Sequence, residues 1–454
     1  MAGDVEIHEE LVLGQAADAS AAASLASAAE QANAHVLHSY GPRVAVAQLD
    51  PTDTPVLAHA LPGDMKIAPA RITKSARQKL SDSEQLGLAA FELRVSDEYA
   101  QAKAERPLPG AAWDGADGAS APGCAELATA PAQASTDEAL SHVGVPLSAR
   151  LSGSIAVGLV LVEGPTATLQ FAATDRTKVV AETQNGATWL GGRHPVQPVT
   201  WSWDIDVIRV DAAADPNAAD LEARWRDPAM AALGYGSGLA GVRAYAEDLR
   251  RQLETDWAYV TFFTKYPTGW FAYASIGGPR LVMQYDNDGW GPDNIDRVFA
   301  HETGHIFNAP DEYASSNCSC GGAWGYYGKP NTNCASCAAG GGVACIMKAN
   351  TWDMCPSTPY HLGFPICPGR LGVQFRGNVP ASSTRRWFTH SWPADCHVVW
   401  SVVPTTVRAG AAQIRWDVHV ERASTGYITY WISVTNITTA QCDVEARYAV
   451  LGST

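Results

Sequence analysis

The chain has 454 residues, of which 46% are hydrophobic and 17% are charged, so it is long enough for about two or three globular domains. A formal net charge of −15, without any lysine- or arginine-rich run, argues against a nucleic-acid partner. The longest apolar run, residues 155–162, is too short to span a bilayer, so we expect no membrane span. The first ten residues lack the basic and then apolar pattern of a signal peptide.

Two segments precede the strongly patterned part of the chain. Residues 5–49 predict a strand, a helix and a strand, which makes 1–60 a small α/β module. Residues 61–143 are rich in Ala, Pro and Gly, a composition typical of a linker, with one predicted helix at 82–103.

The most regular pattern lies in residues 144–378, which we assign to one domain. Strands are predicted at 152–164, 199–210, 258–263 and 279–285, and helices at 239–257 and 295–307. This order is typical of an α/β layer in which the last helix packs beneath a twisted sheet.

The sequence HETGH, at the end of the last predicted helix, offers ligands for a metal ion. His301 and His305 lie one helical turn apart on the same face and can bind one Zn²⁺. Glu302 is then placed beside the metal as a base for a water molecule. A catalytic zinc needs a third protein ligand and an open position, and Asp311, six residues after His305, is our candidate.

The turn after the helix decides whether Asp311 reaches the metal. Asn308 tolerates the left-handed backbone conformation that would send the chain back. Pro310 helps to prevent the helix from resuming. Glu312 is an alternative third ligand, although its position relative to His305 fits less well.

Two motifs resemble those of a known family. HETGHIFNAPD, residues 301–311, resembles the extended zinc motif of the metzincin metallopeptidases and is most similar to the snapalysin type, with Asn308 where metzincins usually carry glycine. CIMKAN, residues 345–350, is similar to the methionine turn of this clan, with Met347 beneath the metal. The resemblance implies a metzincin-like α/β catalytic domain.

The resemblance also implies an activity, that of a zinc-dependent endopeptidase acting on protein or peptide substrates. Water on the zinc would attack the peptide carbonyl while Glu302 accepts the proton of the water and returns it to the leaving amine. Tyr313 is a candidate oxyanion donor, and its alternative role is core packing. We expect the 279–285 strand to offer a free edge to an extended substrate.

A cluster of acids precedes the metal-binding helix. Asp286, Asp288 and Asp293 lie among glycines and could hold Ca²⁺. The alternative is a turn followed by a helix cap.

Seven of the ten cysteines fall in a cysteine-rich insertion at residues 318–367. They predict disulfides and hence an oxidising, extracellular or secreted location. The alternative is a second, structural zinc held by Cys318, Cys320, Cys334 and Cys337. We favour disulfides because a four-thiolate site would leave the other cysteines of the insertion unexplained.

Residues 379–454 predict short alternating strands that form an antiparallel β-sandwich. Cys396 and Cys442 lie near its first and last strands, where we expect a disulfide to link them. The module could contact a cell surface or a glycan, or it could be a structural cap on the catalytic domain.

Three functional hypotheses remain at this stage. The first is a zinc endopeptidase, and the second is a non-catalytic binding or structural protein built on a metzincin fold. The third is a latent zymogen in which residues 1 to about 140 cover the cleft. Residues 1–60 resemble a propeptide module in their pattern, and the alternative is a generic interaction module. Cys124 could then ligate the zinc, form a disulfide or remain a thiol.

Overall fold

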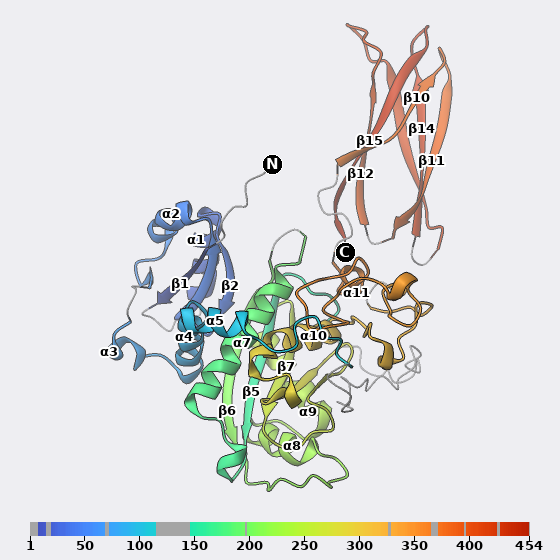
Figure 1. Ribbon diagram of the computed structural model, residues 1–454. Coiled ribbons are helices and arrows are strands. Elements are labelled where there is room, and N and C mark those ends of the chain that lie inside the picture. The colour runs from blue at the N-terminus through green and yellow to red at the C-terminus, as the bar shows by residue number, and fades with distance from the viewer. Residues whose placement is uncertain are drawn as a thin grey trace. The chain divides into compact units, whose positions relative to one another are not determined.

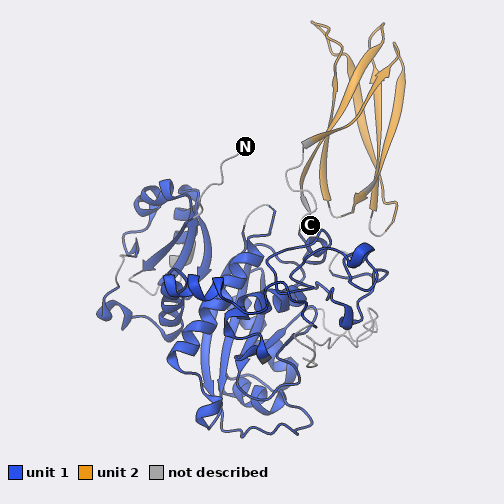
Figure 2. Cartoon of the chain, viewed as in Figure 1, with its two compact units in different colours: residues 1–364 blue, residues 365–454 orange. Residues whose placement is uncertain are grey.

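The chain, described here from a computed structural model, divides into two compact units, residues 1–364 and 365–454 (Figure 2). The structure describes residues 8–14, 20–68, 72–114, 146–195, 198–325, 328–364, 371–394, 396–424 and 427–453. Within these ranges no helix is long and apolar enough to cross a membrane. Cys124 lies outside them, so the three alternatives for its thiol stay open.

A nine-stranded mixed sheet organises the first unit, with the order β4-β1-β3-β2-β6-β5-β7-β9-β8 (Figure 1). Its strands are β1 (His8–Gly14), β2 (His35–Ser39), β3 (Val44–Leu49), β4 (Met65–Ile67), β5 (Ser154–Glu163), β6 (Thr200–Arg209), β7 (Trp257–Thr264), β8 (Ala272–Ala274) and β9 (Arg280–Gln284). Its helices are α1 (Ser20–Gln31), α2 (Thr54–Ala60), α3 (Lys74–Arg77), α4 (Asp82–Arg94), α5 (Asp97–Ala104), α7 (Ala173–Gly191), α8 (Ala223–Ala232), α9 (Gly238–Gln252), α10 (Ile295–Ile306) and α11 (Thr358–His361).

The N-terminal strands belong to the same sheet as the strands that precede the metal motif. β2 runs parallel to β6, with His38 paired to Trp201, and this pairing joins β1–β4 to the rest of the sheet. The structure therefore differs from the expectation of a separate 1–60 module. The predicted 82–103 helix is two helices, because Ser96 interrupts it and caps α5 by accepting a hydrogen bond from the Tyr99 amide.

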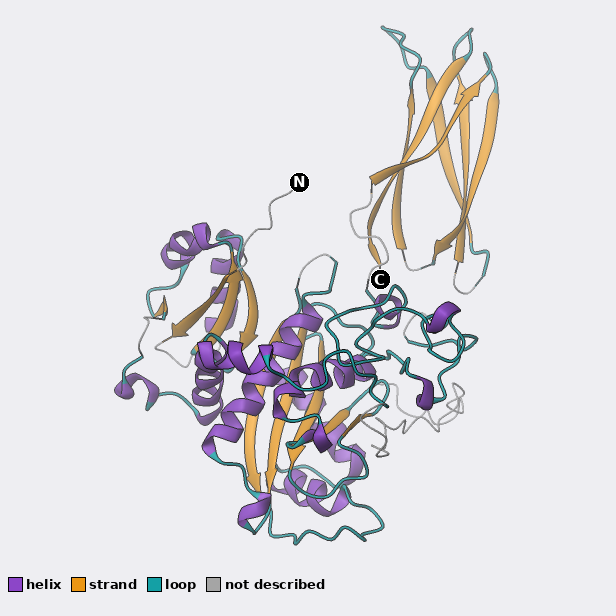
Figure 3. Cartoon of the chain, in the orientation of Figure 1, coloured by secondary structure: helices purple, strands orange, loops and turns teal. Residues whose placement is uncertain are grey.

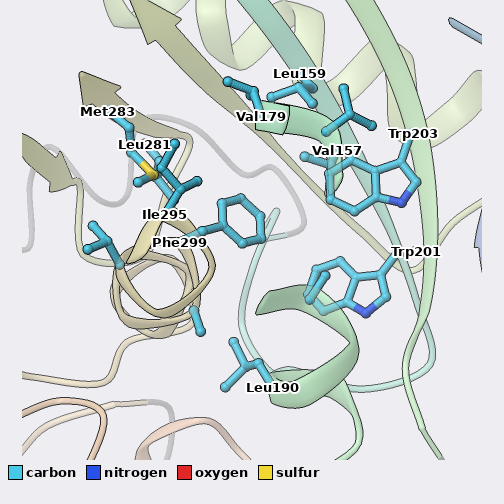
Figure 4. Packing of buried hydrophobic residues seen from close by; sticks show 14 of the residues in the cluster. Val157, Leu159, Val179, Leu190, Trp201, Trp203, Leu281, Met283, Ile295 and Phe299 are labelled. Carbon is cyan, nitrogen blue, oxygen red and sulfur yellow. The ribbon is translucent and has the colours of Figure 1, made fainter. Parts of the chain in front are cut away.

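Helices cover both faces of the central strands. Along β5, Leu159 packs into the core shared with α7 and α10, whereas the next residue, Val160, packs into the core shared with α8 and α9. This alternation follows from the two-residue period of a strand. Ile295 and Phe299 of α10 lie against β9 in the first of these cores (Figure 4). The expected α/β layer with the metal-motif helix packed on the sheet is confirmed.

The helix α7 was not predicted from the sequence, although it packs directly on α10. Gly186 makes the close approach possible, since a Cβ there would lie 2.3 Å from the backbone oxygen of Asp296. Glu182, Thr183 and Gln184 of α7 are buried. Polar residues on a buried face weaken the helical hydrophobic pattern on which the prediction depended.

The edge of the sheet differs from the prediction. β9, within the predicted 279–285 strand, was expected to have a free edge, but β8 pairs with it in an antiparallel register that includes Tyr273 and Val282. β8 is therefore the edge strand. Its three residues are too few to produce a hydrophobic period that a sequence pattern would reveal.

The second unit contains two three-stranded antiparallel sheets, β10-β15-β12 and β11-β14-β13 (Figure 3). Its strands are β10 (Leu371–Val379), β11 (Thr384–Pro393), β12 (Cys396–Pro404), β13 (Ile414–Glu421), β14 (Tyr427–Asn436) and β15 (Cys442–Ser453). Both sheets contribute to one core, as the β-sandwich prediction required, but the unit begins before residue 379.

The predicted disulfide between Cys396 and Cys442 is wrong. Cys442 begins β15, whereas Cys396 pairs in register with Ser453 at the other end of that strand. At about 3.3 Å per residue, the strand from Cys442 to Ser453 places the two cysteines more than about 30 Å apart. No disulfide can span this distance.

Candidate metal centre

The helix α10 is buried on nearly every side. His301 and Glu302 are 0% exposed and His305 is 5% exposed. The helix ends at Ile306, and Asn308 then adopts a left-handed conformation with a φ of 71°. The Asn308 amide donates to His305 O and the Ala309 amide donates to Gly304 O, both at 2.9 Å, which is the hydrogen-bond pattern of a Schellman turn. The turn therefore forms without glycine.

This turn brings Asp311 to the two imidazoles. Asp311 Oδ1 lies 3.1 Å from His301 Nε2 and 3.2 Å from His305 Nε2. The two Nε2 atoms lie 3.1 Å apart. One oxygen and two nitrogens therefore form a nearly equilateral triangle, and these three residues make up one of the groups that could hold a metal ion.

The other nitrogen of each ring faces a backbone carbonyl. His301 Nδ1 lies 3.0 Å from Ile346 O, and His305 Nδ1 lies 2.7 Å from Ala309 O. Because a carbonyl oxygen only accepts hydrogen bonds, each Nδ1 carries the hydrogen, and the Nε2 of a neutral ring presents a lone pair to the triangle. Backbone acceptors of this kind orient metal-binding histidines.

The triangle fits a metal ion. Tetrahedral zinc with bonds of about 2.0–2.1 Å sets its ligand atoms about 3.3 Å apart, close to the observed separations. Asp311 Oδ1 is buried and accepts no hydrogen bond from the described residues. Three lone pairs that converge at this distance in a buried site repel one another unless a cation or a proton lies between them.

The charges of the centre favour an ionised carboxylate. Burial raises the pKa of Asp311, but His305 and His301, when they are protonated and donate from Nε2, lower it well below its usual range. Burial lowers the pKa of His305, and the Asp311 carboxylate, together with smaller contributions, raises it to about 9. The centre thus holds the carboxylate as an anion that can bind a cation.

Met347 lies against the helix between the two histidines. A Cβ on Gly304 would lie 2.7 Å from Met347 Sδ, so the methionine packs on the bare backbone of the helix. The Glu312 amide donates to Met347 O at 2.9 Å and ties the methionine to the segment that carries Asp311. Met347 therefore packs on the helix that carries both histidines, and its role as the methionine beneath a metal stays a prediction.

The structure places Tyr313 beside Asp311. The Tyr313 hydroxyl lies 3.3 Å from Asp311 Oδ2, and the ring is 1% exposed. This contact favours a role in orienting Asp311, and the oxyanion-donor role of Tyr313 stays a prediction.

Glu312 belongs to a different cluster. Its carboxylate accepts hydrogen bonds from Asn333 Nδ2 at 2.6 Å and from Cys355 Sγ at 3.0 Å. Together with Cys345 and Cys355 it forms a second buried group that could hold a metal ion. Because Glu312 faces these thiols, it is not grouped with His301 and His305.

Four cysteines of the insertion form disulfides. Cys318 bonds to Cys334, and Cys320 bonds to Cys337. Disulfide sulfurs cannot act as thiolate ligands, so the alternative of a second, structural zinc at these four residues does not hold. The two bonds indicate an oxidising environment.

The candidate calcium ligands do not gather into a metal-binding group. Asp286 is exposed and precedes the 3₁₀ turn Asn287–Gly289, and Asp293 accepts a hydrogen bond from Lys178 Nζ. The side chain of Asp288 lies outside the described residues. The groups that could hold a metal among the described side chains include neither Asp286 nor Asp293.

A residue that supports the candidate ligands was not predicted from the sequence. Trp113 Nε1 donates to Ile346 O at 2.6 Å, the same carbonyl that faces His301 Nδ1. A tryptophan far upstream in a segment predicted to be a linker carries no pattern that would connect it to a metal site. No protein-family model and no curated protein matches this chain, so the candidate centre rests on its own geometry.

Proposed function

We propose that the protein is a zinc-dependent endopeptidase, in line with the metzincin resemblance of its motifs. The observation that carries this proposal is the convergence of His301 Nε2, His305 Nε2 and Asp311 Oδ1 within 3.2 Å of one another. Three protein ligands of this kind leave a fourth tetrahedral position open, which is typical of catalytic rather than structural zinc.

Glu302 distinguishes catalysis from simple metal binding. When bound, zinc would polarise a peptide carbonyl and lower the pKa of a water molecule. Glu302, one residue after His301 in α10, would accept the proton of the water and pass it to the leaving amine. A non-catalytic metal-binding protein, the alternative function, has no need of a carboxylate at this position.

The burial of the centre supports the idea of a latent form. The three metal-facing residues are at most 5% exposed, so a substrate needs access that this conformation restricts. We propose an extracellular location on the basis of the two disulfides. Surface or glycan contact through the second unit stays a prediction.

Cleavage of casein tests this function. We expect the zinc-loaded protein to cleave casein, a chelator to abolish cleavage, and added zinc to restore it. Cleavage that persists after the metal has been removed would contradict a zinc mechanism. Failure of the zinc-loaded protein to cut either casein or its own chain would favour the non-catalytic alternative.

A further inference from the structure

The segment of residues 103–113 contacts the first turn of the metal-binding helix. Lys103 Nζ lies 3.0 Å from Asp296 Oδ2, and Arg106 Nη1 lies 3.2 Å from Asp296 Oδ1. Asp296 is 0% exposed, so its carboxylate needs these cations. The 103–113 segment thereby fixes the start of α10.

The same segment pairs with the chain that follows the methionine turn. Ala112 and Ala349 form an antiparallel bridge. Gly110 N donates to Asn350 O at 2.7 Å, and Asn350 N donates to Ala111 O at 2.8 Å. Trp113 N adds a bond of 3.2 Å to Lys348 O. The 103–113 segment therefore contacts both parts of the chain that surround His301.

Trp113 reaches the metal centre itself. It is 0% exposed, and its ring centroid lies 5.3 Å from that of His301 in an edge-on arrangement. Ile346 O accepts hydrogen bonds from Trp113 Nε1 at 2.6 Å and from His301 Nδ1 at 3.0 Å. A carbonyl oxygen has two lone pairs and can accept both.

We propose that Trp113 is a positioning residue for His301, and that the 103–113 segment is thereby a structural part of the metal centre. Trp113 holds the Ile346 carbonyl, the carbonyl fixes the tautomer and plane of the His301 ring, and His301 Nε2 is thereby aimed at the metal. The inference rests on the proposed zinc site. In this proposal the N-terminal region supports the metal centre through Trp113. Trp113 acts on the Nδ1 side of the His301 ring, whereas Nε2 of that ring faces the metal.

A matched pair of variants of the full chain tests this role. Trp113→Phe keeps an aromatic ring but removes the N–H that binds Ile346 O. Trp290→Phe is the control, because Trp290 is also 0% exposed, its ring lies 4.9 Å from that of Trp113, and its Nε1 has no hydrogen-bond partner among the described residues. Zinc affinity is measured by competition with a chromophoric chelator, and folding by denaturant unfolding.

We expect Trp113→Phe to weaken zinc binding by about tenfold, and Trp290→Phe to change it less than about twofold. Unchanged zinc affinity in Trp113→Phe, or an equal loss in both variants, would overturn the positioning role. A wild-type chain that binds no zinc would overturn the proposed function as well, so the two failures are distinguishable.

A measurement on the wild-type chain covers the case in which Trp113→Phe does not fold. We expect zinc added to the ¹⁵N-tryptophan-labelled protein to shift one hydrogen-bonded indole N–H resonance, because Trp113 and His301 share an acceptor. Zinc binding that moves no indole resonance would contradict the proposal.

Discussion

Met347 Sδ lies so close to the backbone of Gly304 that a Cβ at residue 304 would be 2.7 Å from it. Gly304 is the residue between His301 and His305 that faces the methionine turn. The two residues thus form one packing unit, in which the sulfur of the methionine occupies the space that a side chain at residue 304 would need.

Substitution of these two residues should show strong coupling. We expect Gly304→Ala to lower the free energy of unfolding by about 1–2 kcal/mol, because overpacking outweighs the better helix propensity of alanine. In a Met347→Ala background the same Gly304→Ala change should cost little, since the sulfur is gone. A double-mutant cycle from denaturant unfolding measures this. Equal costs in both backgrounds would contradict the contact.

Substitution of two neighbouring carboxylates tests which of them is the third zinc ligand. We expect Asp311→Asn to weaken zinc binding by more than about 100-fold, and Glu312→Gln by less than about tenfold, because only the Asp311 carboxylate faces the two imidazoles. Chelator competition gives both affinities. A larger loss in Glu312→Gln would show that Glu312 is the ligand.

The left-handed turn predicts a difference between two substitutions of Asn308. Both Asn308→Gly and Asn308→Ala lose the side-chain hydrogen bond to Ser148 O, but only alanine is strained at a φ of 71°. We expect Asn308→Ala to be less stable than Asn308→Gly by about 1 kcal/mol. Denaturant unfolding of the two variants checks this, and equal stability would argue against the left-handed turn.

The raised pKa of Glu182, in α7, makes the stability of the fold depend on pH. Burial raises its pKa from its usual 4.5 to about 7, with help from Asp296 and against the opposing effect of Lys103. Between these two values the folded state binds more protons than the unfolded state, so the contribution of Glu182 to stability falls as pH rises from about 4.5 to about 7.

We therefore expect Glu182→Gln to gain stability relative to the wild type as pH rises through this window. The free energies of unfolding of both proteins are compared at about pH 4 and about pH 8, which lie just outside the two ends of the window. The difference between the two proteins isolates Glu182 from other groups that titrate. A difference that stays constant, or that changes with the opposite sign, would contradict the raised pKa.

The sequence was most informative where local chemistry decides the structure. The one-turn spacing of His301 and His305 follows from helix geometry, and the left-handed Asn308 follows from its tolerance of that conformation. Asp311 reaches both imidazoles because this turn reverses the chain. These features depend on a single short stretch, so they could be predicted from it.

Features that depend on distant segments could not be predicted in this way. The pairing of β2 with β6 joins residues separated by the whole 61–143 segment, and a local pattern does not specify such a partner. Trp113 meets Ile346 for the same reason, through tertiary contact alone. The error at Cys396 and Cys442 arose because each cysteine begins its strand and the two strands pair antiparallel, which puts the cysteines at opposite ends of the sheet.

The most direct test of the central claim compares the wild type with Glu302→Gln, with zinc content and peptide cleavage measured on the same samples. Glutamine keeps the shape of the side chain but cannot accept the proton of the water. We predict the same zinc content in both proteins and cleavage by the wild type alone. Cleavage by zinc-loaded Glu302→Gln at the wild-type rate would contradict the account.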